Sequence, residues 1–157
     1  MEEYLLEAQE ELKRLEHIIY VSLKYTRTVD VIIGALKRML GTFDLILEAF
    51  LEKAKEENLI DNLPKSPALR AKIVAELYPD DKELQKYLTF YRFLKTILKL
   101  PYDKRQEYRR HVSHIVKLEN STAEMTIDMV TTCEKFMHSF LRYARKKILN
   151  TEDEEEF

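Results

Sequence analysis

The sequence predicts an all-α protein, an up-and-down helical bundle of four main helices plus one or two short helices. Three observations favour this fold class. Only 2 Gly and 4 Pro occur among 157 residues, whereas a β-protein of this length needs many turn residues. Apolar residues recur at intervals of three and four over long stretches, and no stretch shows the alternation of a strand.

The first two helices are expected over residues 3–25 and 29–57. The first has a seam typical of a helix packed along another helix, formed by Leu5, Ala8, Leu12, Leu15, Ile19 and Ser22. Thr26 and Thr28 can cap the second helix. Gly34 and Gly41 lie two turns apart on one of its faces. Each costs about 1 kcal/mol of helix propensity relative to Ala, so we expect another backbone to approach closely there.

A loop and two further helices are expected next. The segment DNLPKSP is the loop, after which Ser66 caps a short helix that begins at Pro67 and ends near residue 78. The turn PDD then caps a helix over about 82–98. That helix is unusually aromatic, and aromatic residues at helical spacing are typical of a core.

The last third of the chain is predicted to form two more helices. One spans 104–117, after the break at Pro101. Ser121 and Glu124 match a capping box that opens the other, which ends near residue 149. Its expected buried stripe is Met125, Met129, Cys133, Phe136, Phe140 and Tyr143 or Ala144. Cys133 is therefore predicted to be a small buried residue without reactivity.

Composition predicts a single domain over residues 1–150 and an acidic disordered tail over 151–157. The tail TEDEEEF holds five acids, and without it 26 bases face 23 acids, a charge of +3 in place of −2. One cysteine suits a reducing compartment, and the acidic start lacks the basic region of a signal peptide. No apolar run reaches the roughly 18 residues of a membrane span, so we predict a cytoplasmic protein without a membrane partner.

The segment PYDKRQEYRRHVSH, which begins at Pro101, concentrates groups that bind anions or transfer protons. It sets Lys104, Arg105, Arg109, Arg110, His111 and His114 against two acids. Its arginines can hold phosphates bidentately, its tyrosines can stack on bases, and a histidine beside arginines suits metal-independent RNA cleavage. We expect Arg105, Tyr108, Arg110 and His111 to bind. The alternative is an exposed amphipathic helix with ordinary surface arginines and one face packed through Tyr108, Val112 and Ile115.

No metal and no cofactor are predicted. Glu107, His111 and His114 follow at i, i+4 and i+7, which would place a carboxylate and two imidazoles on one helical face. Such a site would need a further ligand from another helix or subunit. Neither an HExxH motif nor the Glu-x-x-His of di-iron bundles occurs.

Residues 109–114, RRHVSH, fit an arginine, four residues and a histidine. This resembles the signature motif of the HEPN superfamily, whose members are helical bundles of about this length. The resemblance extends over roughly residues 82–149, with EMTIDMVTTCEKFMHSFLRYARKKI similar to the family's last helix. It implies catalytic roles for Arg109 and His114. Family members are often dimers; some cleave RNA without a metal, and others bind nucleotides or partner nucleotidyltransferases.

The leading prediction is a HEPN-like module that engages RNA or nucleotide, as a metal-independent RNase or as the partner of a nucleotidyltransferase. The alternative is a non-catalytic structural or protein-binding bundle, and a third reading is a metal-binding bundle. The seam of the first helix and the aromatic helix offer more apolar surface than one small bundle covers, so a homodimer is expected.

Overall fold

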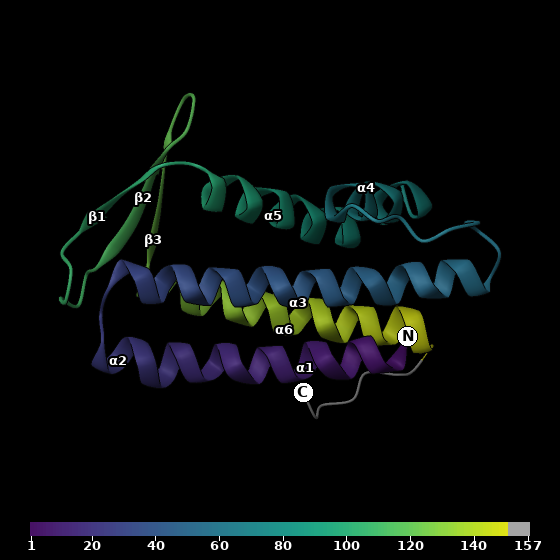
Figure 1. Cartoon of the computed structure of the whole chain (residues 1–157), viewed down its shortest axis with the longest axis horizontal. Coiled ribbons are helices and arrows are strands. Elements are labelled where there is room, and N and C mark those ends of the chain that lie inside the picture. Colours follow the sequence, from purple (N-terminus) through teal and green to yellow (C-terminus); the bar gives the residue numbers. More distant parts are fainter. Residues whose placement is uncertain (151–157) are drawn as a thin grey trace.

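A computed structural model of the chain describes residues 1–150 (Figure 1). The chain is mostly helical, as predicted, but it also contains a small three-stranded sheet, so the prediction of an all-α fold is wrong in that part. The predicted acidic tail, 151–157, lies outside the described residues.

The N-terminal third forms two long antiparallel rods. The first rod comprises α1 (Glu2–His17), a π-helical turn η1 (Ile18–Ser22) and α2 (Leu23–Tyr25). The chain then reverses, and the Thr28 hydroxyl caps α3 (Val29–Glu56) by accepting a hydrogen bond from Val31 N at 3.3 Å. The predicted break at 26–28 is therefore confirmed. Five seam positions of the first rod are buried, namely Leu5, Ala8, Leu12, Leu15 and Ile19.

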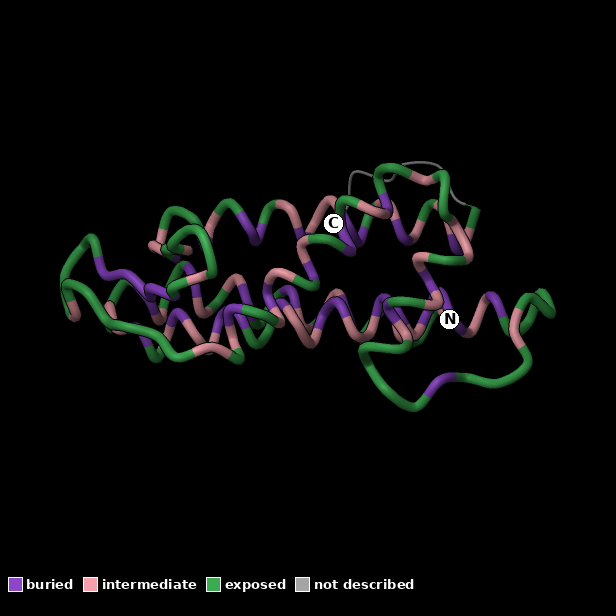
Figure 2. Tube along the Cα trace, turned by 90° about the horizontal axis from the view of Figure 1, so that it is seen from above, coloured by how far each residue is buried: buried purple, intermediate pink, exposed green. Residues whose placement is uncertain are grey.

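The remaining helices close around α3. α4 (Pro67–Leu77) and α5 (Lys82–Lys99) lie on the side of α3 opposite α1, and α6 (Ile127–Leu149) runs beside α3 and α1 (Figure 1). The aromatic residues of α5 are in the core, as predicted: Tyr87 stacks on Phe140 of α6 with ring centroids 4.6 Å apart. Along each helix buried and exposed positions alternate (Figure 2). Nearly all of the buried apolar side chains form one connected cluster.

The segment predicted as a helix over 104–117 is an antiparallel hairpin. β1 (Tyr102–Arg105) pairs with β2 (Ser113–Lys117), which pairs with β3 (Thr122–Thr126). The register places His114 between Lys104 and Met125. The helical reading joined Tyr108, Val112 and Ile115 as one face, but Tyr108 is exposed in a loop while the strand around Ile115 is buried and rich in β-branched residues.

The start of the last helix is also corrected. Glu124 lies in β3, and Thr126, not Ser121, caps α6 by accepting a hydrogen bond from Met129 N at 3.2 Å. The shift moves the helix face, so Met129 is 46% exposed whereas Met125 is buried in the sheet. The buried stripe of α6 is Val130, Cys133, Glu134, Met137, Phe140, Leu141, Ala144 and Ile148.

The expected close backbone approach at the two glycines is not found. A Cβ at Gly34 would meet no atom within 4 Å, and one at Gly41 would meet only a carboxylate oxygen of Glu11, at 3.9 Å. Both positions therefore have room for a side chain, and the structure gives no packing reason for glycine there. Over residues 1–150, no helix combines the length and apolarity that crossing a membrane requires.

The corrected helix start can be tested by a pair of substitutions. Thr126→Ala should lower the free energy of unfolding by about 1 kcal/mol, because it removes the hydroxyl that satisfies a backbone N–H of the first turn. Ser121→Ala, in the exposed turn before β3, should change it by less than about 0.5 kcal/mol. Urea denaturation followed by circular dichroism measures both, and the reverse ranking would restore the capping box at Ser121.

Candidate nucleic-acid interface

The β1–β2 loop is fixed to the end of the helical body. Gln106 and Tyr108 adopt left-handed backbone conformations, with φ of 53° and 64°, which turn the chain sharply. Tyr108 N donates a hydrogen bond to the Arg27 carbonyl at 2.6 Å. The Glu107 carboxylate accepts one from Val29 N at 3.0 Å, in the first turn of α3, where the helix dipole favours a negative charge. These contacts hold the loop in one place.

Two tyrosines are exposed at this end of the molecule. Tyr108 in the loop is 77% exposed, and Tyr25 at the end of α2 is 79% exposed. The loop and α2 lie at the same end of the structure (Figure 1). Exposed rings of this kind are available for stacking on unpaired bases.

The cations of the hairpin divide into paired and unpaired groups. Lys104 lies 3.5 Å from carboxylate oxygens of Asp30 and Glu107, which raise its pKa, Asp30 more strongly. Arg105 lies 3.5 Å from Glu124. Within residues 1–150, Arg109 and Arg110 have no acidic partner, and both are exposed. Their guanidinium groups are free to take up anionic oxygens.

His114 has a different environment from the other predicted site residues. It lies in the central strand, 1% exposed, with its ring 4.9 Å from that of Tyr102. Burial lowers the pKa of its imidazole, so it is neutral at pH 7. Arg109 is exposed in the loop, and within residues 1–150 no hydrogen bond or ion pair joins the two side chains. The structure therefore groups Arg109 with Arg110, His111 and Tyr108 on the loop, and leaves His114 beneath it.

The three residues considered for a metal do not converge. Glu107 binds the backbone of α3, His111 is exposed and His114 is buried. The group in the described chain whose ligand atoms do lie together is Glu16, Glu134 and His138, on α1 and α6.

Charge is strongly separated between the two sides of α3. α1 carries six glutamates and two bases, a net charge of −4. From Lys82 to Lys117, that is α5, β1, the loop and β2, ten Lys or Arg face three acids, a net charge of +7. α5 lies on the opposite side of α3 from α1 and leads directly into β1 (Figure 1). α1 is thus acidic, and the opposite side of α3, with α5 and the hairpin, is basic.

A groove on the basic side was not anticipated from the sequence. It has a volume of about 540 Å³ and lies between α4 and α5. Its lining comprises Ala68, Ala71, Ala75, Thr96, Tyr91, Glu76 and four cations, Lys72, Arg92, Lys95 and Lys99. The sequence did contain a signal for this groove: alanines spaced by three and four on one helix, and cations with the same spacing on the next. Lys95 Nζ lies over the Tyr91 ring, 5.3 Å from its centroid.

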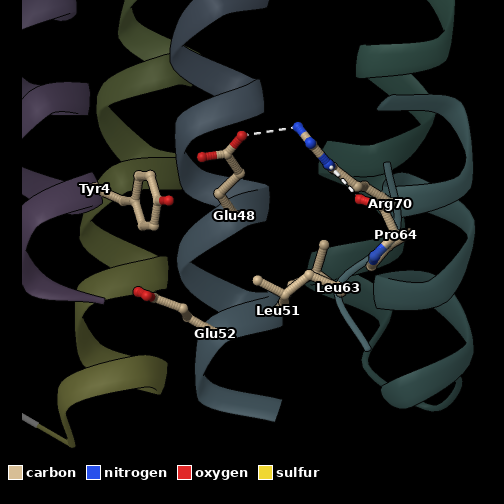
Figure 3. A pocket seen from close by; sticks show the side chains of 7 residues that line it. All are labelled: Tyr4, Glu48, Leu51, Glu52, Leu63, Pro64 and Arg70. Carbon is tan, nitrogen blue, oxygen red and sulfur yellow. Dashed lines mark hydrogen bonds and ion pairs between the residues drawn. The ribbon is translucent and has the colours of Figure 1, made fainter. Parts of the chain in front are cut away.

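A second, smaller pocket of about 90 Å³ has a structural role (Figure 3). Arg70 of α4 donates to a Glu48 oxygen at 2.7 Å and to the Pro64 carbonyl at 3.0 Å, which ties the loop before α4 to α3. The nearby Glu48 carboxylate raises the pKa of Tyr4. This ion pair lines the pocket, whose volume is too small for a nucleotide.

Cys133 is buried, as predicted, and burial raises the pKa of its thiol to about 11. A thiol in this state is a poor nucleophile at neutral pH. Comparisons with protein-family models, with curated proteins and with solved structures find no match for this chain.

The burial of His114 predicts a pH dependence of stability. Protonation costs more in the folded state, so the unfolded state binds more protons as the pH falls below about 6.5. The wild type should therefore lose more unfolding free energy between pH 7.5 and 5 than His114→Phe, by at most about 1.4 kcal/mol per pH unit. His111→Gln, at an exposed position, should follow the wild type. Equal pH profiles for wild type and His114→Phe would show that His114 titrates normally.

Proposed function

We propose that this protein binds single-stranded RNA, or a nucleotide, on the basic side formed by α5 and the β1–β2 hairpin. The observation that carries the proposal is a fixed loop on which the unpaired Arg109 and Arg110 lie beside the exposed ring of Tyr108. The loop follows a helix of net positive charge, α5, and strand β1. The phosphate backbone supplies most of the affinity in such complexes, and it requires unpaired cations.

Each predicted binding residue has a distinct part in this proposal. Arg109 and Arg110 hold phosphate oxygens, since a guanidinium can donate two parallel hydrogen bonds. Tyr108 supplies a stacking surface for a base. Arg105 and His111 extend the surface, although Arg105 also forms an ion pair with Glu124. The groove between α4 and α5 gives the strand a second cationic site along α5.

Cleavage of the bound RNA, with the catalytic roles of Arg109 and His114, stays a prediction from the HEPN resemblance. General acid–base catalysis requires the imidazole to reach the ribose hydroxyl or the leaving oxygen. With His114 1% exposed, that contact requires the hairpin to open. Binding without cleavage is therefore the function that the geometry supports best.

Four more detailed predictions about fold, location and partners also stay proposals. They are the up-and-down bundle of four main helices, the cytoplasmic location, the homodimer and the nucleotidyltransferase partner. The alternative function, a structural or protein-binding bundle, differs from ours in giving the arginines no ligand, so the binding test below separates the two.

RNA binding should depend on the loop and not on total charge. Arg109→Ala together with Arg110→Ala should weaken binding of a fluorescein-labelled oligouridine by about tenfold or more, since each removes a charged hydrogen bond. The slope of log affinity against log salt should fall by about 1.4 for two lost single-strand contacts. Lys13→Ala with Arg14→Ala, the same charge change on α1, should leave both unchanged. Fluorescence anisotropy measures the affinity and its salt dependence. Equal losses of affinity in both double variants would show that binding depends on net charge and not on the loop.

The nuclease prediction has its own test. Labelled RNA is incubated in EDTA with the wild type, Arg109→Ala and His114→Ala, with circular dichroism to verify helicity. We expect the wild type to bind the RNA and leave it intact. Cleavage by the wild type that both folded variants lose would instead establish a metal-independent nuclease and place its site.

A further inference from the structure

Glu134 is a buried acid in the core-facing stripe of α6. It is 4% exposed, and its neighbours in the stripe are apolar, with Val130 and Met137 on adjacent turns. A buried carboxylate is unfavourable unless charge or hydrogen bonds compensate it. Tyr20 donates a hydrogen bond to its Oε1 at 3.4 Å, and His138 Nε2 lies 3.6 Å from its Oε2. Neither distance is short, so the compensation is weak.

A second carboxylate meets the same imidazole. Glu16 of α1 places Oε1 2.8 Å from His138 Nε2. One nitrogen therefore faces two carboxylate oxygens, from Glu16 and Glu134, which are 118 positions apart in the sequence. The ligand atoms of all three side chains lie within 4.8 Å of one another. The nitrogen can face both oxygens favourably only when a hydrogen atom or a metal ion lies between them.

The backbone at this place is irregular in the way that functional sites often are. Tyr20 belongs to the π-helical turn η1, which follows Glu16 directly after His17. π-Helical turns are rare and frequently occur at functional sites. The turn brings the Tyr20 hydroxyl to Glu134, and burial together with that carboxylate raises the pKa of the phenol, burial more strongly.

We propose that Glu16, Glu134 and His138 form a site for a divalent transition-metal ion of the Zn²⁺ type. Two carboxylate oxygens and one imidazole nitrogen are a ligand set that such ions accept, with bonds of about 2.0–2.2 Å. In a tetrahedral site with such bonds, ligand atoms lie about 3.3 Å apart. The two nitrogen–oxygen separations, 2.8 and 3.6 Å, bracket that value, and all three ligand atoms lie within 4.8 Å of one another.

The ion takes the place of the proton on His138 Nε2. The two carboxylates neutralise the charge of the ion, and three protein ligands leave one position for water or for the Tyr20 oxygen. Glu134 and His138 are one helical turn apart on α6, which fixes their mutual orientation, while Glu16 closes the site from α1. The site is remote from the β1–β2 hairpin in sequence and does not depend on the proposed RNA binding.

The test uses the untagged full-length chain. Co²⁺ replaces Zn²⁺ in such sites and has visible absorption, so titration of the wild type with Co²⁺ at pH 7.5 should give a four-coordinate spectrum that saturates at one equivalent. Zn²⁺ should then displace the Co²⁺ and remove the spectrum. His138→Asn and the isosteric Glu134→Gln should each weaken Zn²⁺ binding by about 100-fold or more, since even outer-shell partners account for 10–100-fold.

Two matched variants serve as controls for the metal-binding test. His111→Asn removes an exposed histidine, and Glu11→Gln removes another α1 glutamate; both should bind Zn²⁺ as the wild type does. Circular dichroism establishes that every variant is folded. No saturable Co²⁺ spectrum in the wild type would overturn the proposal and leave a hydrogen bond from His138 Nε2 as the link between the imidazole and the carboxylates. Metal binding that survives His138→Asn but not His111→Asn would also overturn it.

Discussion

Burial of α3 is the constraint on which the rest of the structure depends. Thirteen of its 28 residues are buried, more than in any other helix of residues 1–150, and they face several directions. One partner helix cannot cover such a surface. α1 covers one side, α5 and α4 the other, and α6 closes the gap beside α1. Phe43 shows this, since its ring meets Tyr91 of α5 and Phe140 of α6.

The same arrangement separates the charges. Since α3 is the middle layer, α1 and α5 each turn one face to it and the opposite face to solvent. α1 presents mostly glutamates there, and α5 mostly lysines and arginines. Repulsion within each side is tolerable because water screens it. The basic side then continues into the hairpin, where Arg109 and Arg110 lack acidic partners within the described chain. A surface of this kind attracts polyanions from a distance.

The hairpin shows where sequence reasoning fails. A stretch of fourteen residues with scattered apolar positions fits helical spacing by chance, and short apolar runs do not distinguish helix from strand. Non-local pairing makes this segment a strand, since β2 is stable only between β1 and β3 and against the core. The residues of the candidate binding surface could be named from composition. Their geometry, with His114 buried and Arg109 exposed, could not.

The sequence by itself determined the helices of the body, because amphipathic period, caps and proline positions are local: Thr28, Asp81 and Pro67 lie where predicted at helix starts. It also determined the buried state of Cys133. Tertiary structure alone decided the sheet, the groove between α4 and α5, and the meeting of Glu16 with Glu134 and His138. Each of these depends on packing between segments distant in the chain, and one sequence carries no record of which distant segments meet.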